Sequence, residues 1–423
     1  MRPWVYLENT MKVIVVGAGP AGAALALLLA RYGVEVTLYE RENSSERVFR
    51  GEGLLPLGIE ALREMGLADV LAALPSRRIA SWNIFIEGRE VFVIPEPADE
   101  LGECATRVVS HPALLEAMIE AAQAYPSFRL ERGVRVHDLR YDANGRVAGI
   151  CVIASGEMRE VDTDLVVGCD GRGSLVRTRA GLDLELLPEQ YDVLWFKLPA
   201  PESLRETCKF MLMVRGGAHP ALCYTSWDGH LQYGLILPKG GLGELKGKDW
   251  LRLSTASAPD WLAQHVLERR EQIQGPIRLN VLVGRCPSWT RPGLLLLGDA
   301  AHPMSPVRAQ GVNLALRDAL VAANHLVPVF SQGGDHQALD AAATAVQRER
   351  QPEIVRAQAL QRREAAGQGD ARSASWRFTL AKRVAPVLGR YRWAQRAWLQ
   401  RQHDLRFGSA EVKLRISVDA PPG

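Results

Sequence analysis

The chain has 423 residues and a formal net charge of +3, with 47% hydrophobic and 23% charged residues. This composition is that of an ordinary soluble globular protein with room for two domains or one large composite unit. Its six cysteines form no CxxC pair and no regular spacing, and the first ten residues carry no apolar core. We therefore expect no zinc site, no disulfide framework and no secretory signal. We expect a cytoplasmic location.

A glycine-rich loop follows the first predicted strand, residues 13–16. A helix over 23–30 comes next, and a second strand over 34–39 ends in an acid about twenty residues past the loop. One glycine permits the turn, one lets backbone approach a pyrophosphate and one lets helix and strand pack closely, so this order predicts an adenine dinucleotide site. The residues predicted to bind it are Gly17, Ala18, Gly19, Pro20, Ala21, Gly22, Glu40 and Arg41.

Two kinds of sheet alternate along the rest of the chain. Buried, parallel-type strands are predicted at 165–169 and 294–297, and helical periodicity dominates from Gln310 onward. The other predicted elements are a helix over 58–74, strands at 82–86 and 91–94, a helix over 113–124, a hairpin of 136–141 and 147–154 turning at Asn144-Gly145, and aromatic-rich strands at 193–198, 210–214, 222–227 and 231–237.

Two later motifs narrow the cofactor. The stretch 298–306, from Gly298-Asp299 to Pro306, is followed by Gly311-Val312-Asn313 and Asp318, and it resembles the GD motif of the single-component flavoprotein monooxygenases. This is the group typified by p-hydroxybenzoate hydroxylase. The stretch 169–177, which contains Asp170-Gly171, resembles the DG motif of the same family. With the glycine loop, three motifs stand in the family's order over about three quarters of the chain.

The resemblance implies a fold and a division of the chain. It implies an α/β protein in which a Rossmann-like FAD-binding domain of the glutathione-reductase type is interleaved with a mixed-sheet substrate domain, followed by carboxyl-terminal helices. We expect the FAD-binding domain at 11–80, 105–184 and 286–345, the substrate sheet at 81–104 and 185–285, and the helical region at 346–423.

The resemblance also extends the set of expected FAD contacts. Asp299, at the end of a strand, is placed to bind a ribityl hydroxyl, although it could equally cap a helix. Asp170 has a structural or nicotinamide-related role in the family, and a plain Asp-Gly turn is the alternative. The added FAD contacts are Arg50, Arg107, Asp170, Asp299, Pro306, Gly311, Val312 and Asn313. No catalytic side chain is assigned, because the chemistry is centred on the flavin, and no metal is expected.

The sequence departs from the family pattern at two positions. His111 stands where the family often has arginine, which puts that FAD contact in doubt and makes Arg107 the substitute. Arg308 stands where many members have a small residue. It would either place a cation beside the flavin or form a surface salt bridge, and both interpretations stay open.

As the resemblance implies, NADPH or NADH acts as a transient co-substrate that reduces FAD. O₂ then adds at C4a of the flavin, and the distal oxygen of the hydroperoxide passes to an aromatic or bulky apolar substrate. Residues of the sheet between 185 and 285 would form the cavity wall. The candidates, each of which taken alone is better explained as core, are Trp195, Phe210, Met211, Met213, Tyr224, Trp227 and Tyr233.

Three other functions remain as alternatives. A FAD-dependent reductase of isoprenoid-type double bonds shares the glycine loop and uses no oxygen. A flavin-dependent halogenase is disfavoured because no lysine occurs between Lys12 and Lys197. A non-catalytic FAD-binding protein is disfavoured by the complete GD motif.

Basic residues gather toward the carboxyl-terminal end. Between Arg348 and Arg415 there are sixteen Arg or Lys against six Asp or Glu. A solvated helical surface explains this pattern, and a peripheral contact with an anionic membrane is the alternative. No nucleic-acid partner is expected because no binding motif accompanies the charge. The sequence leaves the oligomeric state open.

Overall fold

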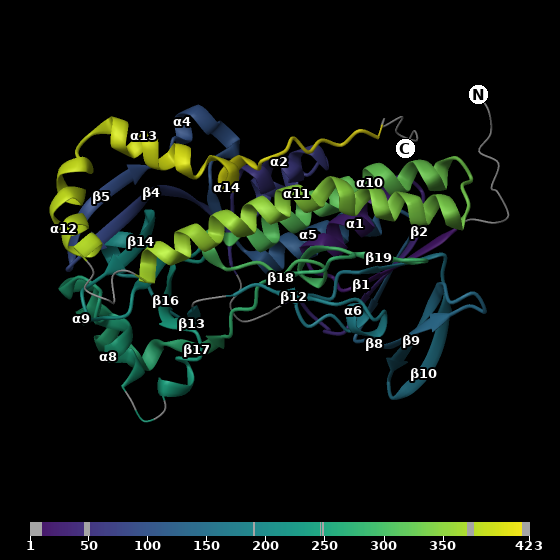
Figure 1. The fold of residues 1–423 in the computed structure, drawn as a ribbon, viewed down its shortest axis with the longest axis horizontal. Coiled ribbons are helices and arrows are strands. Elements are labelled where there is room, and N and C mark those ends of the chain that lie inside the picture. The colour runs from purple at the N-terminus through teal and green to yellow at the C-terminus, as the bar shows by residue number, and fades with distance from the viewer. Residues whose placement is uncertain are drawn as a thin grey trace.

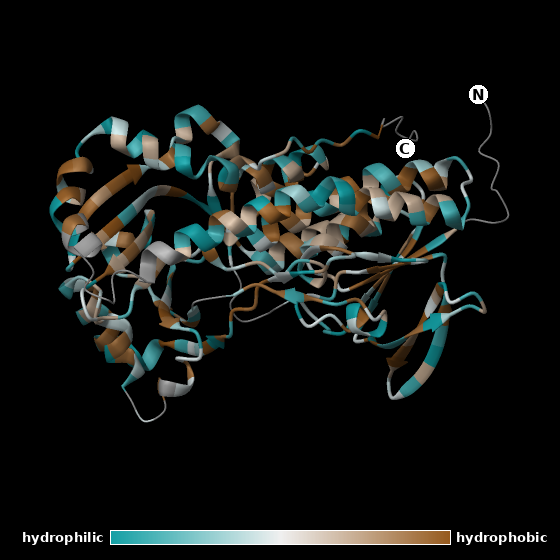
Figure 2. Cartoon of the chain, viewed as in Figure 1, coloured by the Kyte–Doolittle hydropathy of each residue, from teal (hydrophilic) through white to brown (hydrophobic). Residues whose placement is uncertain are grey.

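The computed structural model describes residues 11–45, 51–188, 191–245, 247, 249–369 and 376–416. A six-stranded sheet forms the centre of one half of the molecule (Figure 1). Its central strands are short, apolar and buried, and Figure 2 shows them mostly in brown, whereas the two edge strands are more polar and more exposed. In spatial order they are β19 (Thr290–Arg291), β20 (Leu294–Leu296), β11 (Leu165–Gly168), β1 (Lys12–Val16), β2 (Glu35–Glu40) and β7 (Phe128–Arg132), with only β19 antiparallel to its neighbour.

Helices cover one face of this sheet in two layers. The first helix, α1 (Pro20–Arg31), is buried along ten of its twelve residues, which is why its sequence is almost entirely Ala and Leu. It packs against α10 (Gln310–Ser331) and α5 (His111–Gln123), and α11 (His336–Gly369) lies along α10 (Figure 1). This arrangement brings the end of the chain back over the beginning.

A small antiparallel sheet lies on the other side of the six-stranded sheet. It consists of β8 (Arg135–Tyr141), β9 (Val147–Ala154) and β10 (Glu157–Asp162). The predicted turn at Asn144-Gly145 is confirmed, with Gly145 at φ +77°, a conformation that suits glycine. A short helix, α6 (Leu175–Arg179), packs against β8.

A nine-stranded mixed sheet makes up the other half of the molecule (Figure 1). Two helices, α8 (Trp250–Thr255) and α9 (Asp260–Glu268), cover its outer face. The strands are, in order, β17 (Gln274–Leu279), β13 (Tyr191–Pro199), β16 (His230–Pro238), β15 (Ala221–Thr225), β14 (Cys208–Val214), β4 (Ser76–Ile86), β6 (Arg107–Val109) and β3 (Gly53–Leu54), and β5 (Arg89–Pro95) pairs with β4. Because β3 and β6 belong to this sheet, segments from the first quarter of the chain contribute strands to both large sheets.

The α/β fold class predicted from the sequence is confirmed, and one predicted helix is wrong in its extent. Residues 58–74 form two helices, α2 (Pro56–Glu64) and α3 (Ala68–Ala73), instead of one. Gly66 separates them at φ +71°, a left-handed conformation that ends a helix. The apolar spacing continues across the break, so periodicity alone did not reveal it.

Three helices follow α11 at the carboxyl-terminal end: α12 (Trp376–Leu388), α13 (Arg392–Arg401) and α14 (His403–Phe407). The first two lie over the β4–β5 end of the large sheet, and residues 408–416 then run back along α10 and α2 (Figure 1). Within the described residues, no helix is both long enough and apolar enough to cross a membrane.

Candidate functional site

The glycine loop has three glycines in three different environments. A Cβ atom on Gly17, which has φ +101°, would lie 2.6 Å from the Cys169 carbonyl oxygen, and one on Gly22 would lie 2.0 Å from the Gly17 carbonyl oxygen. Around Gly19 the nearest atom to such a Cβ is 3.9 Å away. Gly17 and Gly22 are therefore required by packing, whereas Gly19 faces open space at the start of α1.

Glu40, at the end of β2, holds the loop from the other side. Its carboxylate accepts hydrogen bonds from the backbone N–H groups of Ala18, at 2.8 Å, and Glu42, at 3.0 Å. It is also buried. The neighbouring Arg41 is exposed and pairs with Glu42 at 3.0 Å. The structure thus places Glu40 beside the loop and directs Arg41 toward solvent, and a contact of either residue with the dinucleotide stays a prediction.

The turn before α10 has an unusual backbone. Arg308 and Ala309 both have left-handed conformations, at φ +58° and +47°, which cost free energy for residues other than glycine. Asn313 holds this turn against β3: its side chain donates to the carbonyl oxygens of Gly53, at 3.1 Å, and Ala309, at 2.7 Å, and accepts from the Leu55 N–H at 3.0 Å. All the polar atoms of Asn313 are therefore used in fixing the turn.

Asp299 and Gly311 face each other across the end of β20. A Cβ atom on Gly311 would meet only the Asp299 Oδ1 atom, at 3.8 Å, so the backbone at the start of α10 is accessible to a bound group. Pro306 precedes the turn and Val312 follows Gly311 in the first turn of α10. The structure therefore brings the predicted residues of the GD motif together.

Asp170 has a different environment. Its carboxylate accepts from the Ser174 hydroxyl at 2.5 Å and from the N–H groups of Leu175 and Val176 at 2.7 and 3.1 Å. These bonds anchor the start of α6, the structural role that the sequence left open beside a nicotinamide-related one. Burial raises the pKa of Asp170 above its usual value.

The predicted arginine contacts have different outcomes. Arg107 is buried in β6, where it donates to the Glu103 carbonyl oxygen at 2.6 Å while its Nε finds no partner among the described residues. Arg50 lies outside the described residues. His111 begins α5 and is buried. Arg107 therefore keeps one buried donor available.

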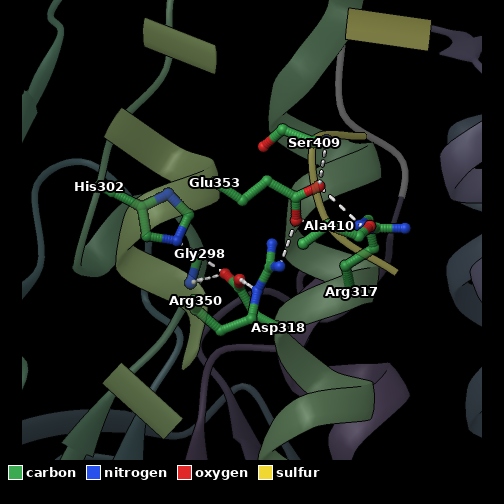
Figure 3. Close-up of polar contacts among 8 residues, drawn as sticks. All are labelled: Gly298, His302, Arg317, Asp318, Arg350, Glu353, Ser409 and Ala410. Atoms are coloured by element: carbon green, nitrogen blue, oxygen red, sulfur yellow. Dashed lines mark hydrogen bonds and ion pairs between the residues drawn. The ribbon is translucent and has the colours of Figure 1, made fainter. Parts of the chain in front are cut away.

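A buried charge network lies behind the GD motif (Figure 3). The Asp318 carboxylate, on α10, accepts from the Gly298 N–H at 3.1 Å and lies 2.7 Å from both His302 Nε2 and Arg350 Nε. Burial opposes this charge, but His302 and Arg350 outweigh burial and hold the pKa of Asp318 below its usual value. His302 is therefore bound within the motif, and no base role follows from its position.

The network continues to the carboxyl-terminal segment (Figure 3). Glu353, on α11, pairs with Arg350 and, at 2.9 Å, with Arg317 of α10. It also accepts from the Ser409 N–H at 3.2 Å, and Arg317 donates to the Ala410 carbonyl oxygen at 2.5 Å. Two arginines and two carboxylates, almost fully buried, thus tie the GD motif, two long helices and residues 409–410 into one unit.

The inner face of the large sheet carries a continuous aromatic layer. Trp195 is 6.2 Å from Tyr224, Tyr224 stacks on Phe210 at 6.2 Å, and Phe210 is 5.1 Å from Trp82, measured between ring centroids. Trp398 of α13 adds a fifth ring, 6.1 Å from Trp82. The layer extends from β13 across β15 and β14 to β4 and faces the turn before α10.

Arg308 joins this layer to the turn. Its guanidinium lies between the rings of Trp82 and Trp398, 4.8 and 4.6 Å from their centroids, and pairs with Glu364 of α11 at 2.8 Å. The side chain is 15% exposed. Arg308 thus forms a salt bridge, although a largely buried one, and its place beside the flavin stays a prediction.

Three candidates for the cavity wall lie on the other side of the sheet. Met211, Met213 and Tyr233 pack in the core beneath α8 and α9, together with Phe196 and Leu262. Successive residues of a strand point to opposite faces, so Phe210 and Tyr224 face inward while these three face outward. The sequence identified the right strands but could not assign their faces.

Comparisons with known proteins agree with this geometry. A family model described as "FAD binding domain" matches residues 10–357. A 6-methylpretetramide 4-monooxygenase from Streptomyces rimosus is 34% identical over 363 residues, which cover 82% of this chain and 82% of that protein. The chain belongs to the FAD-binding flavoprotein monooxygenase family.

More distant members of the family support the same conclusion. A kynurenine 3-monooxygenase from Salinispora tropica is 28% identical over 332 residues, covering 73% of this chain and 71% of the relative. The crystal structure of p-nitrophenol 4-monooxygenase from Pseudomonas putida has the same fold, with a TM-score of 0.75 at 17% identity, covering 96% of this chain and all of that one. The protein is therefore a FAD-dependent oxidoreductase of the monooxygenase type.

The residues present fit FAD. Gly19 and Gly311 leave open space beside helix starts, and Gly19 caps α1 without a side-chain hydrogen bond, so the N–H groups of the first turn stay available for phosphate. Arg107 Nε is a buried donor that finds no partner among the described residues. Which of the predicted residues touch FAD stays a prediction.

Sequence reasoning missed the charge network and one buried carboxyl, Glu52. In the sequence, Asp318 is recognisable only as part of the motif, Arg350 and Glu353 fall within the basic carboxyl-terminal region, and nothing singles out Arg317. A helix with polar residues on every face, as α11 has, could have suggested buried pairs. Glu52 stands between two glycines beside Arg50, and the FAD contact predicted in this stretch is Arg50.

We expect Gly19→Ala and Gly22→Ala to separate cofactor binding from folding. The methyl group of Gly19→Ala would come no closer than 3.9 Å to another protein atom, so the fold should remain while FAD binding weakens at least about tenfold, because the phosphates can no longer approach the backbone. Gly22→Ala should cost on the order of 3 kcal/mol in unfolding free energy. FAD titration and denaturant unfolding measure the two effects. Unchanged FAD affinity in Gly19→Ala would contradict the phosphate site.

We expect Arg350→Met to destabilise the protein by about 3–5 kcal/mol, because Asp318 and Glu353 would lose their shared cation inside the core. Arg356→Met is the matched control on the same helix. Its pair with Asp404 is half exposed, and its loss should cost less than about 1 kcal/mol. Denaturant unfolding of both variants measures the difference, and equal costs would contradict the importance of the network.

The same network predicts loss of stability in acid. The pKa values of Asp318 and Glu353 are lowered in the folded state, so their contribution is complete above the unfolded-state pKa, about 4, and is lost as the pH falls below it. Arg350→Met should lack part of this acid-dependent loss.

Proposed function

We propose that this FAD-dependent monooxygenase acts on a polycyclic phenol that stacks on the aromatic layer. The observation that carries the proposal is the layer itself, since five aromatic rings from β13, β14, β15, β4 and α13 face the turn before α10. Aromatic faces attract flat aromatic ligands by offset stacking and by burial of apolar area. The relative from Streptomyces rimosus, which is named for 6-methylpretetramide, supports a substrate of this kind.

FAD, when bound, activates O₂ with electrons from NADPH or NADH and supplies the oxygen atom that reaches the substrate. The protein's part is to hold the cofactor along separated segments. We infer contacts to its adenosine and phosphate half from Gly17 to Gly22, Glu40 and Arg41, and to its flavin half from the second motif group. That group comprises Arg50, Arg107, Asp170, Asp299, Pro306, Gly311, Val312 and Asn313.

We infer the division of labour between segments from the same sites. Residues 11–80, 105–184 and 286–345 would hold FAD, and residues 81–104 and 185–285 would hold the substrate. The pairing of β3 and β6 with the substrate sheet makes these strands the junction between the two parts. The region 346–423 would cover the aromatic layer through Trp398 and so exclude water from the reacting atoms.

The proposed reaction is tested by measuring O₂ consumption and the incorporation of oxygen into the product. We expect a polycyclic phenol screen to find compounds that accelerate NADPH or NADH oxidation by the FAD-loaded protein, consume O₂ and gain one oxygen by mass. Substrate-dependent NAD(P)H oxidation with a reduced product and no O₂ uptake would instead indicate the double-bond reductase. Trp195→Ala should raise KM for an accepted phenol about tenfold, because one stacking face is lost.

We further propose that α12 and α13 rest on an anionic lipid surface. Trp393 is 62% exposed and Tyr391 51%, their rings are stacked, and Val387 is 53% exposed. Exposed arginines surround them, and none of these forms an ion pair within the described residues. They are Arg383, Arg390, Arg392 and Arg396. Aromatic side chains flanked by unpaired cations are typical of surfaces that contact anionic lipid.

Vesicle co-sedimentation tests this contact. We expect binding to phosphatidylserine-containing vesicles, weaker binding to phosphatidylcholine alone, and loss of binding at high salt. Trp393→Ser should reduce binding several-fold. The matched control is Trp261→Ser, which removes another exposed tryptophan from α9. Equal recovery in the supernatant with both vesicle types would contradict the membrane contact.

A further inference from the structure

Glu52 is a buried carboxyl group with neutral donors around it. The residue lies immediately before β3, and its side chain reaches the large sheet. Its oxygens accept from the Ser226 hydroxyl at 2.7 and 2.8 Å and from the Gln232 side-chain amide at 3.0 Å. No salt bridge of Glu52 occurs among the described residues. The buried carboxylates of Asp318 and Glu353, by contrast, have arginine partners, and that of Asp192 has a lysine partner.

The donors to Glu52 are held in place by the aromatic layer. The Trp195 indole N–H donates to the Gln232 side-chain oxygen at 2.6 Å, which turns the amide N–H₂ of Gln232 toward Glu52. The Tyr224 hydroxyl also lies in hydrogen-bond contact with the Glu52 backbone. The carboxyl is therefore fixed against the same face of the sheet as the rings that would stack on the substrate.

On its carboxyl-terminal side, Glu52 is followed by backbone that contacts the turn before α10. Gly53 approaches Ala309 so closely that a Cβ on it would lie 3.0 Å from the Ala309 side chain, and Asn313 binds the Gly53 carbonyl oxygen. Glu52 thus stands where the GD-motif turn meets the aromatic layer. In this position a substrate and a flavin would both be within its neighbourhood.

The surroundings of Glu52 allow its carboxyl group to gain or lose a proton near neutral pH. Burial raises its pKa to about 7, against the opposing effects of Ser226, Lys197 and Gln232, while Asp228 raises it further. Lys197 itself pairs with Asp228 at 2.5 Å, and His230 lies beside Asp228. Burial raises the pKa of Cys208 to about 12 and that of Tyr224 well above its usual value. These two neighbours therefore stay protonated while Glu52 exchanges its proton near neutral pH.

We propose that Glu52 accepts the proton of the substrate hydroxyl group in this monooxygenase. In this step the O–H bond of the phenol breaks, an O–H bond forms on the Glu52 carboxylate, and the electron pair stays on the phenolate oxygen. No oxidant or reductant is needed. The phenolate is more electron-rich than the phenol, so its ring accepts an electrophilic oxygen more readily. The proposal rests on the phenolic substrate class proposed above.

Other buried groups near the site do not offer this step. Asp318 is bound by an arginine, His302 and a backbone N–H, and Asp170 has three donors from α6. Glu96 accepts from Trp82 and pairs with Arg406. Glu52 alone among these carboxyls combines neutral partners with a position against the aromatic layer.

Glu52→Gln tests the proposal, with Glu96→Gln as the control for loss of a buried carboxyl. The first readout is the unfolding free energy of the FAD-loaded, oxidised protein against pH. Because the folded-state pKa of Glu52 is raised, the wild type should lose stability as the pH rises through about 7. Glu52→Gln should lack this loss, whereas Glu96→Gln should lower stability and keep it. Ser226→Ala should move the loss to higher pH, since the serine hydrogen bond lowers the pKa.

The second readout is the ionisation of a bound probe, 4-nitro-1-naphthol, read from its absorption spectrum without NAD(P)H. Its nitro group lowers the pKa of the hydroxyl below the value of about 10 that is typical of a simple phenol, so that a carboxylate with a pKa of about 7 can take its proton. We expect wild type to bind the naphtholate at a pH where free 4-nitro-1-naphthol is neutral, and Glu52→Gln to bind the neutral form. With an accepted substrate, kcat of Glu52→Gln should fall on the order of 100-fold, and the fall should shrink as the pH rises.

The outcomes separate this proposal from the proposed function. If both proteins bind the phenolate equally, the assignment of Glu52 is overturned and the substrate class stands. If wild type binds no polycyclic phenol, the substrate class is overturned, and the proposal with it. An unchanged pH profile of stability in Glu52→Gln would overturn the titration of Glu52 even where the variant folds poorly, because Ser226→Ala reports the same group independently.

Discussion

The buried pairing of Asp318 and Glu353 with Arg350 is the interaction on which the rest of the structure depends (Figure 3). Each carboxylate would be expensive to bury alone, so the three side chains are stable only together. Through Gly298 and Arg317 the cluster fixes both the start of the GD motif and the carboxyl-terminal segment. Elements far apart in the sequence are therefore joined by buried charge as well as by apolar packing.

This constraint also explains how the strained turn before α10 persists. Arg308 and Ala309 keep left-handed conformations because their surroundings hold them on every side. Asn313 ties the turn to β3, and Gln310 donates to the Leu405 carbonyl oxygen at 2.8 Å. The helix α14 thus stabilises this turn through Leu405, while α13 contributes Trp398 to the aromatic layer.

The sequence predicted what depends on local geometry. Gly17, Gly22 and Glu40 are required by a turn, a close helix–strand contact and a backbone N–H, all within one βαβ unit, and each lies where the motif implies. Contacts between distant segments could not be predicted in this way. Which face of a strand meets the flavin domain depends on how two sheets pack, and that packing separated Phe210 from Met211. The partners of Glu52 stand 174 and 180 residues away in the chain.

Glu52 and Asp318 show how partners decide the use of a buried carboxyl. Both are buried and both accept hydrogen bonds, but Asp318 has a cation at 2.7 Å whereas Glu52 has a hydroxyl and an amide. The cation keeps the pKa of Asp318 low, so that group stays ionised and serves the architecture. Without a cation, burial raises the pKa of Glu52 to about 7, where a proton can be gained or lost at little cost. A carboxyl in the second kind of environment, placed beside stacked aromatic rings, suits proton exchange with an aromatic hydroxyl.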